Sequence, residues 1–514
     1  MTRTITGAAA DLRAGRVSAV ELVDAAIARA EAADATLGVF LHRDDERARA
    51  AARAADDRLA RGEPIGPLEG IPLGIKDILA CADGPTTAQS LVLDPAWARG
   101  QGDAPAVARL RGAGGIVLGK LTTMEFALGV PDVSKPFPVP RNAWHPGHYA
   151  GGSSSGCGSG VASGMVLGAL GSDTAGSIRM PAGFNGVTGL KPTFGRVPKS
   201  GMVPLSYTLD HVGPVARSAR DCALLLSVLA GHHPADPYAA ADVPGDYLGG
   251  LTGDLAGVRV GYDDLDRFAP RADSLLRQRF TAMLAIFEDA GAELVPVRLP
   301  MYEELHAIDS VVMLAEALSY HVRDLESRAG DYGQATRVLL CGARGITAAH
   351  YLQAMRVRRI AQARMDALLE TVDLVVTPMG HLPAPRMDEI SGLEPTGVMT
   401  SLHTAYWNPL GNPTLVVPMG LSAAGLPLAL SISGRRWEES VVLRAGDAVQ
   451  GLSSHHLGTP PDPGPPLPPP PAPSGSEAEV VAQLQAALAA LGESLSGIAE
   501  ARYVEPSGGY ACGR

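Results

Sequence analysis

The stretch GSDTAGSIR, residues 171–179, lies in a Gly-, Ser-, Thr- and Pro-rich region that runs from Gly66 to about Gly213. Short apolar runs and helical stretches alternate through this region, which favours an α/β fold. Ser177 ends a Thr-Ala-Gly turn, and consecutive N–H groups in such a turn form an anion-binding nest. Cleavage of an acyl compound needs a nucleophilic oxygen, a base and donors for the oxyanion. The stretch therefore makes Ser177 a candidate nucleophile.

Two further segments, GIPLGIKD at 70–77 and GGSSSG at 151–156, combine glycines with a base or a hydroxyl group. Lys76 is the only lysine of the five that stands in a Gly-rich, apolar stretch. Burial disfavours the charged form of a lysine and lowers its pKa towards that of a useful base. Ser153 and Ser154 also fit a G-x-S-x-G pattern, but 141–150 does not read as the strand that a nucleophile elbow requires.

These three segments closely resemble the amidase signature family of serine hydrolases. The resemblance spans about residues 5–455 and includes GKLTTMEFALG, GLKPTFGRVPKSGMVPL and NPLGNPTLVVPMGLSAAGLPLALSISG. It implies a Ser–cis-Ser–Lys triad in which Ser177 is the nucleophile, Ser153 the bridging cis-serine and Lys76 the base. It also implies that the oxyanion is held by four backbone N–H groups, those of Thr174, Ala175, Gly176 and Ser177. No cofactor or metal is implied.

The resemblance further implies one α/β domain with a large twisted mixed sheet of about eleven strands, flanked by helices. We expect this catalytic domain to cover 1–458, a Pro-rich linker to cover 459–473, and a short helical tail to cover 474–514. The tail has one apolar face, so we expect it to dock on the body, on a second copy or on a partner. Near the N-terminus, 18–33 predicts a helix opened by a capping box, and 40–62 predicts a second helix.

The resemblance implies that substrate contacts come from the segment before the cis-serine loop and from the C-terminal half of the body. The residues expected to make contacts are Phe126, Ala127, Tyr149 and Ser154. Aromatic residues near Ser401–Asn408 are a further candidate wall for an apolar acyl group, with core packing as the alternative. Arg179 is expected to fix the nucleophile turn by pairing with a carboxylate.

The expected reaction is hydrolysis of a small-molecule amide to an acid plus ammonia or an amine. One alternative is the glutamine-hydrolysing component of a tRNA-dependent amidotransferase, which usually carries LDQ where this chain has LDH at 209–211. A second alternative is a catalytically silent scaffold, against which the intact Lys76, Ser153 and Ser177 argue. Dimerisation is compatible with the resemblance.

Composition excludes some functional classes. The 514 residues carry 43 Lys and Arg against 54 Asp and Glu, and the net charge of −11 argues against nucleic-acid binding. The longest apolar stretches do not suit a membrane span. Five scattered cysteines and an N-terminus without a secretory apolar run lead us to expect a cytoplasmic protein.

Overall fold

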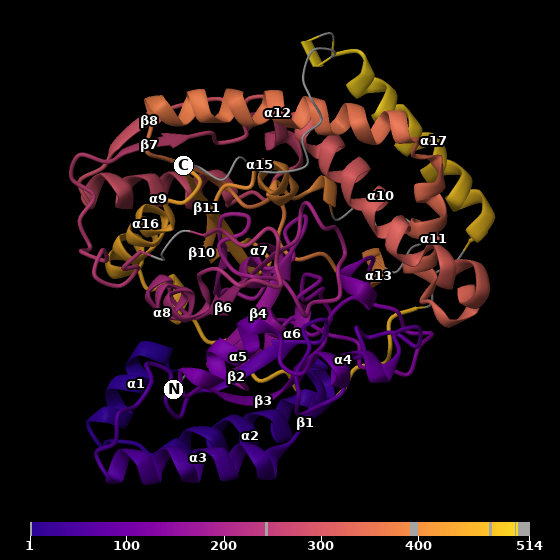
Figure 1. Ribbon diagram of the computed structural model, residues 1–514. Coiled ribbons are helices and arrows are strands. Elements are labelled where there is room, and N and C mark those ends of the chain that lie inside the picture. Colours follow the sequence, from indigo (N-terminus) through magenta and orange to yellow (C-terminus); the bar gives the residue numbers. More distant parts are fainter. Residues whose placement is uncertain (1–2, 242–244, 391–398, 472–474, 499, 502–514) are drawn as a thin grey trace.

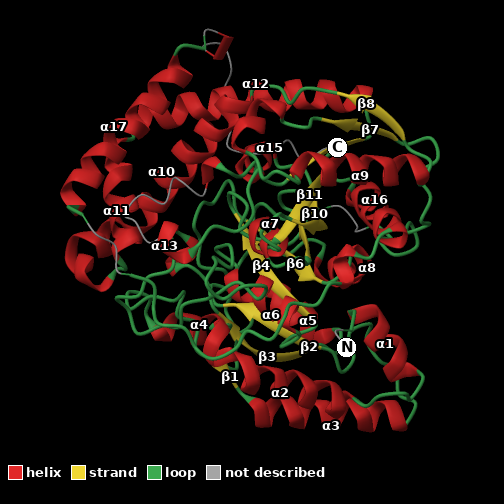
Figure 2. Cartoon of the chain, turned by 180° about the vertical axis from the view of Figure 1, so that it is seen from behind, coloured by secondary structure: helices red, strands yellow, loops and turns green. Residues whose placement is uncertain are grey.

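A computed structural model describes residues 3–241, 245–390, 399–471, 475–498 and 500–501 of the chain. One mixed sheet runs through the middle of the molecule, and helices cover both of its faces (Figures 1 and 2). The predicted α/β domain with about eleven strands is confirmed. In the described part of the chain, no helix has the length and apolar character needed to cross a membrane.

The eleven strands follow the order β1-β3-β2-β4-β6-β5-β10-β11-β9-β7-β8 across the sheet. Their bounds are β1 Phe40–Arg43, β2 Pro72–Lys76, β3 Ile116–Leu121, β4 Gly168–Asp173, β5 Thr188–Lys191, β6 His211–Ala216, β7 Arg259–Tyr262, β8 Glu293–Pro296, β9 Leu374–Pro378, β10 Thr414–Leu421 and β11 Pro427–Gly434. Strand β2 is parallel to both β3 and β4, whereas β10 is antiparallel to both β5 and β11.

Strands β2 and β4 lie in the interior of the sheet, and every residue of both is buried. Strands that are covered on both faces read as continuous apolar or small-residue runs rather than as alternating patterns. Because the two strands are parallel neighbours, their carboxyl ends meet at the same edge of the sheet. Lys76 ends β2 and Asp173 ends β4, so the sheet brings two of the predicted site segments together.

The main helices are α1 Ile5–Arg13, α2 Ala19–Leu37, α3 Asp45–Ala60, α4 Pro95–Gln101, α5 Pro105–Gly112, α6 Ser155–Ser163, α7 Arg179–Phe184, α8 Ala219–Leu229, α9 Leu276–Asp289, α10 Tyr302–Arg328, α11 Gln334–Gly342, α12 Ala348–Thr371, α13 Met387–Ile390, α15 Trp407–Leu410, α16 Glu439–Leu452 and α17 Glu477–Ser496. The 3-10 helices are η1 Glu125–Ala127, η2 Asp266–Arg271, η3 Ala329–Asp331, η4 Ala343–Gly345, η5 Thr404–Tyr406 and η6 His455–Leu457.

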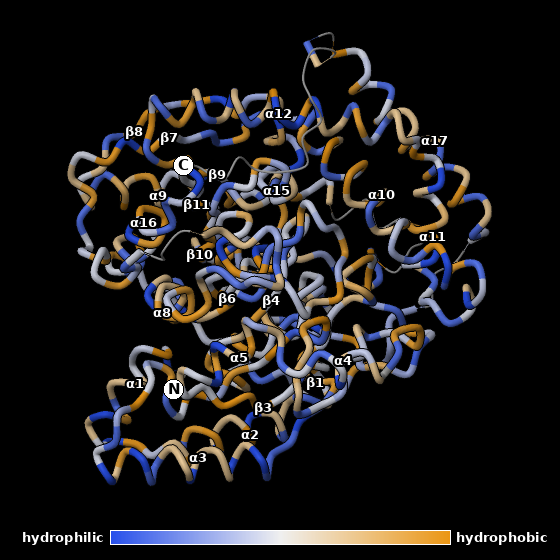
Figure 3. Tube along the Cα trace, in the orientation of Figure 1, coloured by the Kyte–Doolittle hydropathy of each residue, from blue (hydrophilic) through white to orange (hydrophobic). Residues whose placement is uncertain are grey.

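The N-terminal helices confirm one sequence prediction and correct another. The predicted capping box at Ser18 and Glu21 is present and opens α2, which extends to Leu37. The prediction of one helix over 40–62 was wrong at its start, because Phe40–Arg43 pairs with β3 as an edge strand. Helix α3 then begins after Asp44, whose side chain caps it. Helices α2 and α3 alternate between hydrophilic and hydrophobic residues (Figure 3), as expected of surface helices.

The tail helix α17 packs on the body of its own chain, against α10, α11 and α12 (Figure 1). Leu484, Leu488 and Leu495 of its apolar face are buried there. Of the three docking places that the sequence left open, the structure shows the first. Before it, the Pro-rich stretch is tied to the body at Gly464, whose carbonyl accepts a hydrogen bond from Thr36 Oγ1 at 2.8 Å.

Candidate active site

Lys76 lies at the end of β2 and is completely buried. Its Nζ is 2.6 Å from Ser153 Oγ and 2.8 Å from Ser172 Oγ. Burial lowers the pKa of Lys76 to about 7, with only partial opposition from Cys157 and two buried carboxylates. A substantial fraction of Lys76 is therefore a neutral amine near pH 7, which is the form that accepts a proton.

Ser153 follows a cis peptide bond from Gly152. The carbonyl of Ser153 accepts a hydrogen bond from the Met124 N–H at 3.2 Å. The Gly152 N–H donates to Met180 Sδ at 3.3 Å. A side chain at position 152 would collide with Tyr149, because an added Cβ would lie 2.3 Å from its Oη. The loop is thus enclosed tightly enough to require glycine next to Ser153.

Ser177 lies in the turn between β4 and α7 and is 8% exposed. Its carbonyl accepts a hydrogen bond from the Ser154 N–H at 3.1 Å, which joins the nucleophile turn to the cis-serine loop. The structure therefore brings the three predicted catalytic residues to one edge of the sheet, although 101 positions separate Lys76 from Ser177 in the sequence. The Lys76 side chain thus contacts Ser153 directly, and the backbone of Ser177 is joined to the same loop.

Asp173 organises the nucleophile turn through its buried carboxylate. It accepts backbone N–H groups from Gly176 at 2.9 Å and Ile178 at 3.1 Å. It also forms a two-pronged ion pair with Arg179, with both contacts between 2.8 and 2.9 Å. Burial alone would raise the pKa of Asp173, but the Arg179 guanidinium holds it well below the usual value. The expected pairing of Arg179 with a carboxylate is present.

Two residues from far along the chain complete this network. Asn408 Nδ2 donates to Asp173 Oδ1 at 2.9 Å, and its Oδ1 accepts from Arg179 Nη2. Thr404 Oγ1 donates to the Ala175 carbonyl at 2.7 Å. A Cβ at Gly176, where φ is 128°, would lie 2.1 Å from Thr404 Oγ1. Only glycine fits there, because both the conformation and the space exclude a side chain.

The backbone donors of the turn divide into two groups. Gly176 N–H is taken by Asp173, so the prediction that it holds the oxyanion requires correction. Among the described residues, no protein acceptor takes the N–H groups of Thr174, Ala175 and Ser177. Ala175 has no positive φ, so alanine is accommodated where a glycine was expected from the family resemblance. The Thr174 hydroxyl is held by Asp210 Oδ1 at 2.6 Å.

The predicted substrate contacts have different surroundings. Ser154 Oγ donates to the Ser172 carbonyl and accepts the Ser172 N–H, so it fastens the loop to β4 and is a poor substrate contact. Tyr149 is 3% exposed beside the cis-serine loop. Phe126 is 2% exposed, and its ring centroid lies 4.4 Å from that of His321. Ala127 is buried next to Phe126 with a φ of 61°.

An apolar cluster lies beside the cis-serine loop and is rich in methionine. Its buried members are Met124, Tyr149, Met180, Phe184, Met379, Ala384, Met387, Ile390, Leu402, Val416 and Ala429. Unbranched methionine side chains adapt to irregular shapes, and such surfaces suit apolar ligands of variable form. By contrast, Tyr406 and Trp407 belong to another core cluster, which agrees with the packing alternative for that segment.

Burial alone does not distinguish Lys76, the predicted base, from the other lysines. Lys120 is 2% exposed and pairs with Asp77 at 3.0 Å, while Lys191 is fully buried and donates to the Asn412 carbonyl. The expectation that only Lys76 occupies such surroundings was therefore wrong. Lys76 differs in that its nearest polar contacts are two serine hydroxyl groups.

A family model described as Amidase matches residues 21–443. The chain belongs to the amidase family. It is accordingly an enzyme that hydrolyses amide bonds, and one structural neighbour is described as a peptide amidase. The alternative of a catalytically silent scaffold is therefore not supported.

Relatives of this amidase include two differently described groups. It is 37% identical to the protein of Chloroflexus aurantiacus described as the A subunit of glutamyl-tRNA(Gln) amidotransferase, over 89% of this chain and 98% of the relative. It is 36% identical to the putative amidase AmiD of Mycobacterium tuberculosis, over 88% of this chain and 94% of the relative. It also resembles the solved peptide amidase of Stenotrophomonas maltophilia, with 27% identity and a TM-score of 0.75 over 90% of this chain and 98% of that one.

Sequence reasoning missed several residues around the site of this amidase. Thr404 and Asn408 act on a turn more than 220 positions earlier, and no local pattern announces such contacts. Ser172 stands inside the 171–179 motif, but nothing in that motif indicates its contact with Lys76. The methionines of the apolar cluster could have been found only because Met124 and Met180 stand next to motif segments in the sequence.

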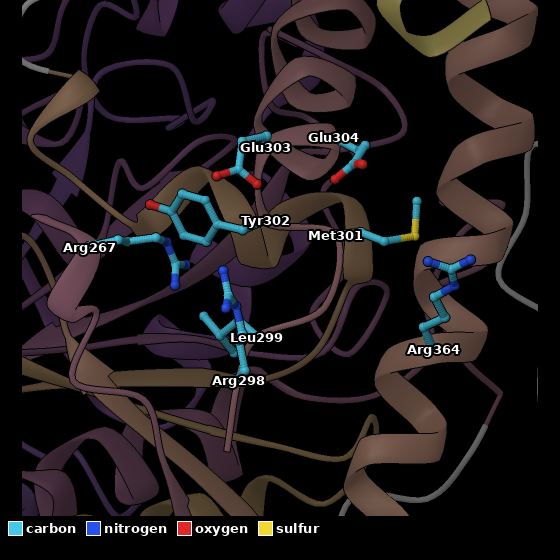
Figure 4. A pocket seen from close by; sticks show the side chains of 8 residues that line it. All are labelled: Arg267, Arg298, Leu299, Met301, Tyr302, Glu303, Glu304 and Arg364. Atoms are coloured by element: carbon cyan, nitrogen blue, oxygen red, sulfur yellow. The ribbon is translucent and has the colours of Figure 1, made fainter. Parts of the chain in front are cut away.

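A separate pocket of about 240 Å³ lies between η2, the start of α10 and α12 (Figure 4). It is lined by Arg267, Arg298, Leu299, Met301, Tyr302, Glu303, Glu304 and Arg364. None of these side chains contacts Lys76, Ser153 or Ser177 through a hydrogen bond in the described structure. Among all residues that the structure describes, no group of three or more His, Cys, Asp or Glu side chains is arranged to hold a metal ion.

Proposed function

We propose that this amidase cleaves a carboxylic amide of a small molecule to an acid plus ammonia or an amine, through an acyl-enzyme on Ser177. The observation that carries the proposal is Lys76 Nζ, fully buried and 2.6 Å from Ser153 Oγ, with a pKa lowered to about 7. A lysine in this state is a base poised near neutral pH.

The proposed sequence of steps uses only groups of this chain and one water molecule. Neutral Lys76 accepts the proton of Ser153, which in turn accepts the proton of Ser177. Ser177 Oγ bonds to the carbonyl carbon, and the oxyanion is held by the N–H groups of Thr174, Ala175 and Ser177. The relayed proton passes to the leaving nitrogen as the C–N bond breaks. Water then attacks the ester carbonyl carbon and gives a proton to Lys76 through Ser153. The ester C–O bond breaks as Ser177 Oγ takes this proton back and the acid leaves.

The apolar cluster beside the loop supports an apolar acyl group in the substrate. Met124 and Met180 both contact the cis peptide: the Met124 N–H donates to the Ser153 carbonyl, and the Gly152 N–H donates to Met180 Sδ. We place the acyl portion against these two side chains and Tyr149. Phe126 and Ala127 remain proposed as a more distant part of the same wall.

A second candidate is glutamine hydrolysis for a partner protein, because a relative 37% identical carries an amidotransferase description. His211, the residue that departs from LDQ, is buried and contacts Asp173. Its Nδ1 lies 2.6 Å from the Leu209 carbonyl and 3.2 Å from the Asp173 carbonyl. This difference touches the residue that organises the nucleophile turn, which favours the stand-alone amidase.

Ammonia release from a panel of amides tests both candidates. The panel contains aliphatic, aryl and peptide amides, a carbamate, a urea and glutamine, each with wild type, Ser177→Ala and Ser159→Ala. Ser159 is a matched control because its buried hydroxyl has no partner in the described structure. Turnover of an apolar amide that is lost only in Ser177→Ala supports the proposal. Turnover of glutamine alone supports the second candidate, and turnover that persists in Ser177→Ala contradicts both.

A cytoplasmic location is part of the proposal. Cys81, Cys157, Cys222 and Cys341 are free thiols, which suits a reducing compartment.

A further inference from the structure

The C-terminal segment, defined here as residues 459–471 together with α17, contacts Arg141 in the loop that precedes Ser153 and Arg337 in α11. We propose that this segment is a brace that positions the cis-serine loop, acting through Arg141 on one side and Arg337 on the other. The segment lies outside the 21–443 match to the family model. Its role is therefore a property of this chain beyond its proposed reaction.

Arg141 makes the first connection and is 6% exposed. Its Nη2 donates to the Pro468 carbonyl of the brace at 2.6 Å, and its Nη1 donates to the Pro146 carbonyl at 3.0 Å. Its backbone also forms a bridge with Tyr149. One guanidinium thus fastens the Pro-rich stretch to the loop that continues directly into the cis peptide. A proline-rich chain suits this task, because it is stiff without internal hydrogen bonds.

Arg337 of α11 makes the second connection. It binds the carboxylate of Glu477, the first residue of α17, with Nε at 3.0 Å from Oε2 and Nη2 on Oε1. Its Nη1 donates to the carbonyls of Ala329 at 3.2 Å and Tyr332 at 3.1 Å. Two-pronged arginine–carboxylate pairs fix orientation as well as distance. The start of α17 therefore sets the position of 329–333.

From 329–333 the contacts continue to the active site. The Gly333 N–H donates to Glu125 Oε2 at 2.7 Å, and the Tyr332 ring centroid lies 6.0 Å from that of Phe126. Met124, the neighbour of Glu125, donates its N–H to the Ser153 carbonyl. A continuous series of packed and hydrogen-bonded groups thus joins Glu477 to Ser153.

Close packing fixes the register of α17, so that Glu477 meets Arg337. A Cβ at Gly342 of α11 would lie 2.8 Å from Leu484 Cβ, and one at Gly492 would lie 2.4 Å from the His350 ring. Glycines at these contact points let α17 approach α11 and α12 closely. Such specific packing differs from that of a loosely held tail.

The test uses two variants that remove brace contacts while leaving the loops' own contacts in place. Glu477→Gln removes the charge that Arg337 binds, and Thr36→Val removes the hydroxyl that anchors the Gly464 carbonyl. Glu493→Gln is the matched control, because Glu493 also joins α17 to the body, through His350, but has no connection to 329–333. Two readouts are followed: hydrogen exchange of 124–127 and 141–154, and the rate at which a fluorophosphonate labels Ser177.

We expect the double variant Thr36→Val/Glu477→Gln to label about tenfold more slowly than wild type, because small displacements of catalytic groups lower rates steeply. Exchange should quicken in 124–127 and 141–154 in that variant and stay unchanged there in Glu493→Gln. Hydrogen exchange reports on the brace even if Ser177 proves not to be the nucleophile. The proposal is overturned if quickened exchange stays confined to the brace, or if Glu493→Gln changes both loops equally.

Discussion

The nucleophile turn at 171–179 and the tail helix α17 are both held by charged and packed contacts, but in opposite proportions. The turn is built around the fully buried Asp173–Arg179 pair. Helix α17 relies on buried leucines, and its charged side chains are more exposed: Glu477, which pairs with Arg337, is 35% exposed, and Glu493, beside His350, is 74% exposed. A buried charge whose partner is removed is costly, whereas an exposed pair contributes little. Single substitutions in the charged contacts should therefore destabilise the turn strongly and the tail only slightly.

The largest effect is expected on activity, at Ser177. Ser177→Ala should lower kcat/KM by about 10⁴-fold or more, because it removes the attacking oxygen. The free energy of unfolding should change by less than about 1 kcal/mol, because the substitution keeps the Ser177 carbonyl that accepts the Ser154 N–H. Steady-state kinetics and urea denaturation measure the two quantities. A large loss of stability with modest loss of activity would assign Ser177 to the structure.

Asp173→Asn should produce the largest loss of stability. The substitution leaves the Arg179 guanidinium buried without its counter-charge, which costs about 3–5 kcal/mol. Asp373→Asn is the control, because Asp373 also pairs with arginines but its side chain is 25% exposed. That variant should lose less than about 1 kcal/mol in urea denaturation. Equal losses would mean that burial does not distinguish the two sites.

Much of the nucleophile turn was predictable from its own sequence, whereas the distant residues that hydrogen-bond to it were not. Lys76, Ser153 and Ser177 stand in short motifs, so residue type and resemblance were sufficient to select them as candidates, and the structure brings their segments together. Asn408 was invisible because its contact with Asp173 spans 235 positions and depends on how the whole sheet is assembled. The strand count came from resemblance, because buried central strands carry no alternating signal.

The tail gave the opposite result. Its helix and apolar face were predictable from periodicity and the capping serine at 476, whose side chain accepts the Glu479 N–H. Its docking place was not, because an apolar stripe is complementary to many grooves. The absence of side chains at Gly342 and Gly345 lets α17 pack closely, but this role can be recognised only after α17 has been placed. Ser154 and Gly176 N–H were misassigned because their hydrogen-bond partners are set by tertiary contacts.

Lys76→Met tests how much the burial of Lys76 costs in free energy of unfolding. Because burial lowers the pKa of Lys76 from 10.5 to about 7, the unfolded chain binds more protons between these values. The contribution of Lys76 to stability therefore rises with pH by about 1.4 kcal/mol per unit across this window. Urea denaturation should show Lys76→Met more stable than wild type at pH 7, with the difference shrinking towards pH 10. A constant difference would contradict the lowered pKa.

A smaller effect is expected in the tail. Leu488 is 5% exposed, and Leu488→Ala should weaken the docking of α17 by about 2–3 kcal/mol. Hydrogen exchange should quicken along α17, while the sheet strands keep their protection. Gln483→Ala, on the exposed face of the same helix, should leave exchange unchanged. Loss of protection throughout the sheet would show that α17 is part of the body's core.

The central claim, that Lys76 activates Ser177 through Ser153, is tested most directly by the pH dependence of fluorophosphonate labelling. The adduct is located by peptide mass spectrometry between pH 5 and 9. Because the reactive form needs neutral Lys76, labelling of Ser177 should rise about tenfold per pH unit below about 7 and level off above it. Lys76→Ala and Ser153→Ala should abolish this dependence together with most of the labelling. An adduct on Ser154, or a rate on Ser177 that is flat through pH 7, would contradict the account.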